Sequence, residues 1–180
     1  PDPGFDCDGN PLPCTSDVCL SFANFDETNM TVDLWMVNTV DVAGYQIELA
    51  GATITGGEGG SSYTAGFMVS NSGSMILGFS VAGDVITPSE GNLVTISFTD
   101  YVGFICFVEG DQTLFSDADA QGLSLELGDC QGEVIEGCMD DMACNYDADA
   151  NVSGDCDYGT TCWDDSVQCD ENDCPDIPTV

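Results

Sequence analysis

The sequence contains no lysine, arginine or histidine in 180 residues, against 33 aspartates and glutamates, which gives a formal charge of −33. No fold of such a chain can hold a salt bridge between side chains. The like charges must therefore be handled by distance, by salt screening or by bound cations. Nucleic acid is excluded as a partner, because its binding needs Lys or Arg to displace counterions. Anionic membrane surfaces are disfavoured for the same reason.

Composition nevertheless favours a folded chain. Hydrophobic residues make up 43% and aromatic residues 9% of the sequence, which is enough for a core at this length. No stretch approaches the roughly 18 apolar residues of a membrane span, so we expect no membrane insertion. The acidic balance is typical of a salty exterior rather than of an intracellular domain. We expect a secreted, extracellular or cell-surface protein, and a mature piece of a longer precursor.

Eleven cysteines indicate disulfides. No two are spaced C-x-x-C and histidine is absent, so the usual zinc signatures fail and an oxidising, extracellular setting is favoured. An odd number means that at least one cysteine has no partner within the chain, and Cys19 is our first choice for a link to another chain. The cysteines expected in bridges are Cys7, Cys14, Cys106, Cys130, Cys138, Cys144, Cys156, Cys162, Cys169 and Cys174.

Composition also divides the chain into three segments. Residues 1–19 form a short head rich in Pro, Asp and Cys. Residues 20–130 are rich in alternating apolar residues and contain only two cysteines, whereas residues 131–180 form an acidic tail with six. We therefore expect one ordinary domain between a small head and a disulfide-rich tail.

The middle segment has the period of two that is typical of half-buried strands. Gly/Ser/Asn-rich breaks separate the runs, and no long stretch has the helical period. We predict an all-β fold of about nine strands in two packed antiparallel sheets. The clearest runs are 30–36, with Met30, Val32, Leu34 and Met36 on one face, 45–49, 94–99, and 123–127, with Leu123, Leu125 and Leu127 inside.

A cross-strand disulfide is predicted at the end of this segment. The runs FICFVEGDQTLF (104–115) and GLSLELGDC (122–130) flank the turn SDADAQG. Folding the two runs into a hairpin about that turn places Cys106 opposite Cys130, which would permit a bridge.

Residues 20–130 resemble the cohesin-type β-sandwich modules, especially those inside large secreted proteins of marine bacteria. The best matches are DVAGYQIEL, GFSVAGDVITPSEGNLVTISF and SDADAQGLSLELGDC. The resemblance implies an antiparallel jelly-roll β-sandwich akin to some carbohydrate-binding modules. It implies a folding unit more firmly than a partner, because a fold does not fix a function.

The tail stretch GCMDDMACNYDADANVSGDCDY resembles a short Cys/Asp motif repeated in similar surface proteins. In that pattern the segment ending C-x-Y is followed by something like PDPGFDCDGN, which is how this chain begins. The head thus looks like the continuation of the tail. The resemblance implies one period of a repeating polypeptide, or a chain that joins copies of itself from head to tail.

The same tail stretch is the main candidate for a metal site. Calcium takes six to eight hard oxygen ligands, and alternating Asx residues can wrap a loop around it. The spacing is not that of an EF-hand, and a solvated acidic linker is the alternative. The candidate Ca²⁺ ligands are Asn145, Asp147, Asp149, Asn151, Asp155 and Asp157, with Asp140 and Asp141 completing the shell.

Two smaller clusters are also good turn sequences, because Asp, Asn and Gly favour tight bends. In the head, Asp6, Asp8 and Asn10 fit a calcium site or a turn equally well. At 117–121 (DADAQ) the turn is favoured over a metal site.

Catalysis has little support in this composition. Without His, Lys or Arg there is no Ser–His pair, Schiff-base lysine or arginine clamp, so we expect no enzyme. Asn29 and Asn151 match the glycosylation sequon, which also occurs often by chance. Sugars can stack on exposed aromatic rings, although rings within alternating strands can instead belong to the core. The candidate rings are Trp35, Tyr45, Tyr63, Tyr101 and Trp163.

The sequence therefore favours a non-enzymatic extracellular structural module, braced by disulfides and calcium, that self-associates into a surface fibre or adhesive array. The alternative is a carbohydrate- or dockerin-type binding module of a larger secreted protein, with a polysaccharide or protein ligand.

Overall fold

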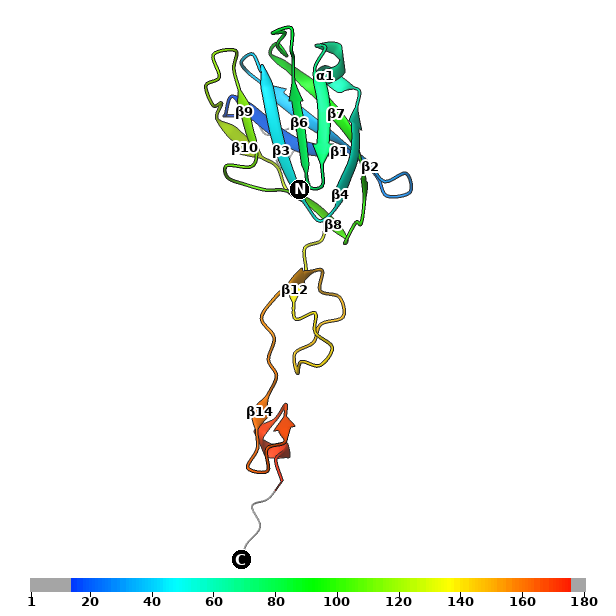
Figure 1. Ribbon diagram of the computed structural model, residues 1–180, viewed down its shortest axis with the longest axis vertical. Helices are drawn as coiled ribbons and strands as arrows, with labels where there is room; N and C mark the ends of the chain where they lie inside the picture. The colour runs from blue at the N-terminus through cyan, green and yellow to red at the C-terminus, as the bar shows by residue number, and fades with distance from the viewer. Residues whose placement is uncertain (1–13, 176–180) are drawn as a thin grey trace, which may run out of the picture. The chain divides into compact units, whose positions relative to one another are not determined.

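The computed structural model describes residues 14–175, shown in Figure 1. The chain divides into two compact units between Gly132 and Glu133. We call the described residues 14–132 the sandwich unit and the described residues 133–175 the tail unit. The head candidates Asp6, Cys7 and Asp8 lie outside the described residues.

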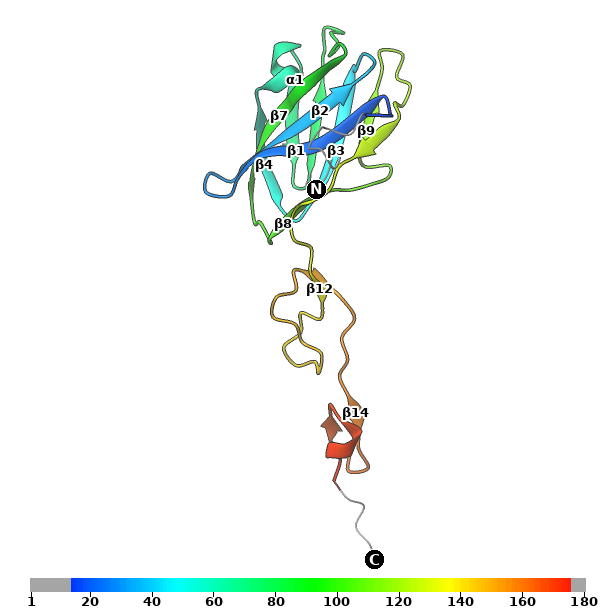
Figure 2. The same ribbon diagram turned by 180° about the vertical axis from the view of Figure 1, so that it is seen from behind.

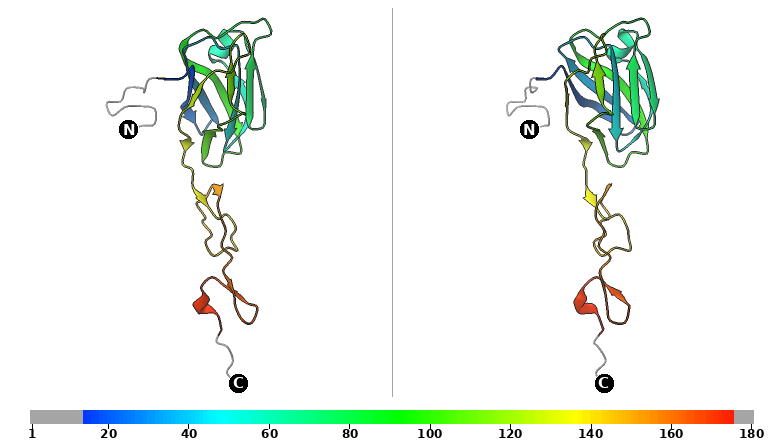
Figure 3. Two further views of the ribbon diagram at one scale, coloured as in Figure 1. Left: turned by 90° about the vertical axis from the view of Figure 1, so that its left-hand side faces the viewer. Right: turned by 60° about the vertical axis from the view of Figure 1, so that its left-hand side comes forward.

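Two packed sheets form the sandwich unit, and Figures 1 and 2 look onto one sheet each. Figure 3 shows the two layers from the side. The first sheet has the order β10-β1-β2-β7-β4, with β1 Val18–Asp26, β2 Thr31–Asn38, β4 Thr53–Glu58, β7 Ser89–Thr99 and β10 Leu125–Leu127. The second has the order β11-β8-β3-β6-β5, and β9 also pairs with β3; its strands are β3 Gly44–Ala50, β5 Met68–Ser72, β6 Met75–Phe79, β8 Phe104–Phe107, β9 Leu114–Ser116 and β11 Gln131–Gly132.

The predicted alternation accounts for the core between these sheets. On β2, Val32, Leu34 and Met36 are buried at every second position, and the residues between them are half-buried. Met30, predicted to share their face, is instead 38% exposed and has a positive φ of 53°. It belongs to the turn before β2, where the chain reverses and the strand period no longer applies. The all-β sandwich with a disulfide-rich tail is confirmed.

Tyr45 is the largest polar side chain in this core. Its ring packs near Phe67 and Phe115, and its hydroxyl lies 2.8 Å from the Ser62 hydroxyl. Ser62 is fully buried in the short helix α1 (Gly60–Thr64), which packs against β7. Burial raises the pKa of Tyr45 to about 12, although the hydrogen bond with Ser62 opposes this rise. The buried hydroxyl is thus satisfied as the interior requires.

The predicted last hairpin is wrong, although the predicted disulfide is present. Strand β10 pairs in parallel with β1 in the first sheet, so that sheet is not purely antiparallel. Strand β8 pairs instead with β11, with Gln131 opposite Ile105. The next pair in this register is Cys106 and Cys130, which form a disulfide. The segment between them therefore crosses from one sheet to the other and returns.

The tail unit has almost no apolar core. Its buried residues are Cys138, Ala143 and Cys162, and two of these are disulfide-bonded. Its elements are four two-residue strands, β12 Glu136–Gly137, β13 Val152–Ser153, β14 Thr160–Thr161 and β15 Val167–Gln168, and the short 3-10 helix η1 Glu171–Asp173. No helix among the described residues is long and apolar enough to cross a membrane.

Packing around Tyr45 gives a test of the sandwich core. A Cβ atom at Gly78 on β6 would overlap the Tyr45 ring, whereas one at Gly56 on β4 would meet nothing within 4 Å. Gly78→Ala is therefore expected to lower the free energy of unfolding by about 1–3 kcal/mol, as overpacking does. Gly56→Ala is the control and should change it by less than about 0.5 kcal/mol. Chemical denaturation measures both; equal effects would contradict this packing.

Candidate functional site

The predicted calcium ligands lie in the tail unit, where two asparagines brace the loop. The Asn151 side chain accepts a hydrogen bond from the Ile135 N–H at 2.8 Å and donates to the Glu133 carbonyl at 2.7 Å. Asn145 accepts from the Asp157 N–H at 2.8 Å and donates to the Asp155 carbonyl at 2.9 Å. Both amides thus tie together backbone segments 10 to 18 residues apart in sequence.

Three of the aspartates close tight turns of the same loop. Asp147 accepts from the Asp149 N–H, and Asp157 accepts from the Gly159 N–H. Asp140 accepts from the Met142 N–H and from the Tyr158 hydroxyl. Side chains of this type commonly bond the backbone two residues on.

Hydrogen bonds also shift the acidity of one pair. The Met142 N–H, and after it the Tyr158 hydroxyl, lower the pKa of Asp140. The same contact raises the pKa of Tyr158, because its proton is held by the Asp140 carboxylate. These bonds stabilise the negative charge without a cation.

The calcium geometry itself is not assembled in the described residues. Within residues 14–175, no three Cys, Asp or Glu side chains gather closely enough to hold a metal ion. The loop carboxylates are spread along its turns, and Asn145 and Asn151 already use both amide atoms. This arrangement does not fit a calcium ion, and no step below is routed through one at this loop. Calcium binding by the chain stays a prediction.

Disulfides account for ten of the eleven cysteines. Besides Cys106–Cys130, they are Cys14–Cys19, Cys138–Cys156, Cys144–Cys169 and Cys162–Cys174. Choosing Cys19 for a link to another chain was wrong. It begins the sheet on β1, where its Cα lies 5.8 Å from that of Cys14, within the range of a disulfide. The eleventh cysteine is Cys7, outside the described residues.

The two sequons differ in their surroundings. Asn29 is exposed in the turn between β1 and β2, where its amide donates to Asp26. Hydrogen bonds from Asn29, first from its N–H, lower the pKa of Asp26. In the other sequon, both amide atoms of Asn151 are occupied. Near β10, Asp117 accepts from the Asp119 and Gln121 N–H groups, which is the turn that the sequence favoured.

The candidate sugar-stacking rings do not form one surface. Tyr45 is buried in the core, and Trp35 and Tyr101 are half-buried. Tyr63 is 79% exposed on α1, whereas the exposed Trp163 belongs to the tail unit. The Trp163 indole N–H donates to the Pro175 carbonyl. The rings therefore give no row of the kind that a polysaccharide chain needs.

An exposed apolar face on the second sheet was missed by the sequence analysis. Phe79 on β6 pairs with Met68 on β5, and Leu77 pairs with Gln46 on β3, which is paired in turn with Leu114 on β9. All four apolar side chains are between 38% and 55% exposed. We call Met68, Leu77, Phe79 and Leu114 the apolar face. The signal was present in MILGF (75–79), which is apolar at both parities, whereas a strand with one solvated face alternates with polar residues.

No protein-family model matches the sequence, and no curated protein matches it. Solved structures with a similar chain fold include a chain of a CaDoc0917 variant in complex with CaCohA2, with a TM-score of 0.46, 11% identity, and coverage of 64% of this chain and 98% of that one. A non-cellulosomal cohesin from the hyperthermophilic archaeon Archaeoglobus fulgidus gives 0.45 and 12%, covering 65% and 89%. The sixth cohesin from scaffoldin B of Acetivibrio cellulolyticus, in complex with a Cel5 dockerin, gives 0.39 and 8%, covering 62% and 98%. Likenesses at this level do not decide the family, the partner or the function of this chain.

The asparagine braces give a test of what orders the tail unit. Asn151→Ala removes two hydrogen bonds and leaves the half-buried Ile135 N–H without its acceptor. The free energy of local opening at Ile135 should fall by about 1–3 kcal/mol. Asp149→Ala in the same loop is the control, because its side chain accepts no hydrogen bond from the described residues. Hydrogen exchange at the Ile135 amide measures the change, and unaltered protection in Asn151→Ala would show that the disulfides alone fix this segment.

Proposed function

We propose that the protein is a non-enzymatic extracellular structural module, a subunit of a surface fibre or adhesive array. The observation that supports this proposal most is the construction of the tail unit. Three disulfides lie within its described residues, while only three of those residues are buried hydrophobics. Such a unit persists through covalent bonds where a core cannot form, as in small secreted domains. It contains no apolar cavity or catalytic constellation, and it suits a durable spacer between folded modules.

Self-association from head to tail is the finer part of this proposal. The sequence pattern of the head continues that of the tail, and an odd number of cysteines leaves one for a bond between chains. A contact between different surfaces of two copies gives rings or open filaments. At −33 per subunit, association needs cations at the junction, and Ca²⁺ carries the most suitable charge and ligand preference.

Assembly of the purified chain tests the fibre proposal. Millimolar calcium under oxidising conditions is expected to raise the mean mass well above that of the 18.9 kDa chain. Sodium chloride at equal ionic strength should raise it much less, because it screens charge without bridging carboxylates. Light scattering measures the mass. Cys7→Ser is expected to retain calcium-dependent assembly but to lose disulfide-linked dimers on a non-reducing gel. A strict monomer at high calcium would contradict the fibre proposal.

A protein-binding module is the second candidate, and the apolar face favours it. Exposed apolar side chains that adjoin across three neighbouring strands mark interaction sites more often than scattered ones do. The aromatic rings provide no comparable surface for a polysaccharide. A dockerin-type or other protein ligand is therefore the form of the binding proposal that the described residues support.

Charge introduced on the apolar face distinguishes this candidate from the first. Leu77→Asp combined with Phe79→Asp should abolish capture of a protein ligand from the native secretion, because the partner's apolar surface would meet two unpaired charges. Ser21→Asp combined with Thr99→Asp places the same charge on exposed positions of the first sheet and is the control. Quantitative pull-down with the wild type as reference measures both. Equal capture by all three proteins would eliminate the apolar face as a binding site.

A further inference from the structure

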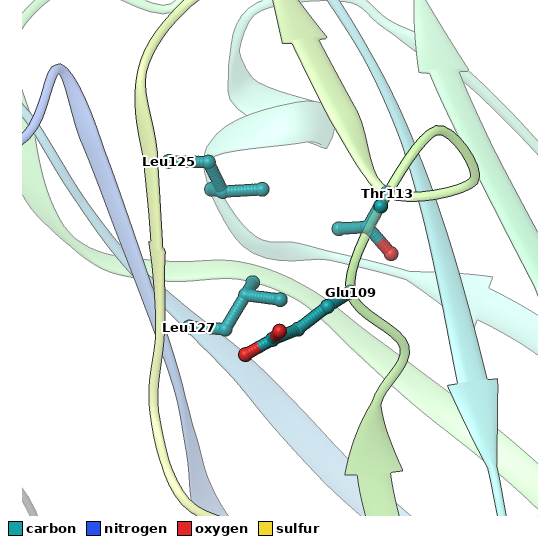
Figure 4. A pocket seen from close by; sticks show the side chains of 5 residues that line it. Glu109, Thr113, Leu125 and Leu127 are labelled. Carbon is teal, nitrogen blue, oxygen red and sulfur yellow. The ribbon is translucent and has the colours of Figure 1, made fainter.

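A cleft of about 360 Å³ opens at the rim of the sandwich unit, as Figure 4 shows. It lies between strand β10 and the segment that joins β8 to β9. Its lining residues are Glu109, Gly110, Thr113, Leu125 and Leu127. The volume falls within the range of about 300–1,000 Å³ that is usual for ligand pockets.

One wall of the cleft is apolar. Leu125 and Leu127 occupy alternate positions on β10 and are half-buried against the edge of the core. Strand β10 is the last strand of its sheet and pairs only with β1 within the described residues. The outer flank of β10 therefore stays uncovered, and its leucines line an opening into the space between the sheets.

The other wall supplies a single negative charge. Figure 4 shows the Glu109 side chain extending from the β8–β9 segment toward Leu127. The chain contains no Lys, Arg or His, so no residue of this protein can neutralise that carboxylate. A counterion for Glu109 must come from outside the molecule.

A metal ion is a poor match for this cleft. Calcium needs six to eight oxygen ligands, and within the described residues no group of three potential metal-binding side chains occurs. The Thr113 hydroxyl is engaged by the backbone of Glu48, accepting from its N–H at 3.1 Å and donating to its carbonyl at 3.5 Å. The Gly110 carbonyl accepts from the Thr113 N–H at 3.3 Å. One free carboxylate beside two leucines suits an organic cation with an aliphatic stem.

We propose that this cleft binds a lysine side chain presented by a partner protein. The lysine stem packs against Leu125 and Leu127, and its ammonium group pairs with Glu109. Lysine combines these two features, because its apolar stem can lie along a hydrophobic surface while its charged end stays polar. A second copy of this chain is excluded as the occupant, since it has no lysine to offer. The inference does not depend on the structural role proposed above.

The net charge supports this choice of occupant but cannot by itself provide a site. A field from 33 acidic residues attracts any cationic protein and raises its rate of encounter. That attraction is spread over the surface and is weakened by salt. The cleft adds an apolar contact that a free sodium or calcium ion cannot use. Retention of binding at physiological salt is therefore the property that separates the cleft from the general field.

Titration of the full chain with small probes tests the proposal. N-acetyl-lysine N-methylamide is the probe, and N-acetyl-norleucine N-methylamide is its uncharged counterpart with a similar stem. In protein with labelled leucine methyl groups, at about 0.15 M salt, the lysine probe is expected to shift the signals of Leu125 and Leu127. The norleucine probe should bind about fivefold more weakly, which is the upper end for an exposed ion pair.

Two variants of equal charge assign the effect to one carboxylate. Glu109→Gln is expected to weaken the lysine probe by the same factor of about five. Glu126→Gln is the control, because Glu126 lies on β10 between the two leucines but on the opposite face, where Thr15 donates to it. It should leave the affinity unchanged. Equal binding of both probes, equal losses in both variants, or shifts that bypass Leu125 and Leu127 would each overturn the proposal.

Discussion

The absence of any cationic side chain determines how every carboxylate in this molecule is accommodated. In an ordinary domain an ion pair lowers the pKa of a buried or crowded acid. Here that role falls to hydrogen-bond donors that carry no charge. The Ser124 hydroxyl and N–H lower the pKa of Asp17, and Ser166 and Asn172 do the same for Asp164 and Asp170. Together with Asp26 and Asp140, these acids tie turns and strand ends to backbone N–H groups.

This mode of accommodation has opposite consequences on acidification. A carboxyl whose pKa is lowered in the folded state contributes stability above its unfolded pKa, and this is lost as the pH falls through the folded pKa. The turns closed by Asp26 and Asp140 therefore weaken in acid. Protonation also reduces the repulsion among 33 like charges, which favours the compact state. These acids are fully exposed, so the screened surface bonds are the smaller of the two effects.

The sandwich was largely predictable because period-two alternation reports burial directly, as on β2 with Val32, Leu34 and Met36. Alternation does not report which sheet a strand joins. The leucines of β10 were correctly placed toward the core, yet β10 pairs with β1 rather than with β8. Cys106 and Cys130 still meet, because β11 continues the chain back to β8 after the excursion to the first sheet. The apolar face and the cleft were not predictable, since both arise from the pairing of distant segments. In the tail unit the sequence showed which side chains are oxygen-rich, but not that Asn145 and Asn151 use those atoms to bind their own backbone.

Salt separates the surfaces of this protein by the sign of its effect. At physiological ionic strength the Debye length is about 8 Å, so repulsion between two copies acts mainly at close approach. Added salt weakens that repulsion and favours contact between copies. The same salt weakens the attraction of a cationic partner to Glu109 and to the surrounding field, but it leaves the apolar contacts with Leu125 and Leu127 intact. An all-acidic module of this kind can therefore remain dispersed from its own copies in dilute solution while recruiting cationic partners, and can associate with itself only where cations are abundant or a covalent bond forms.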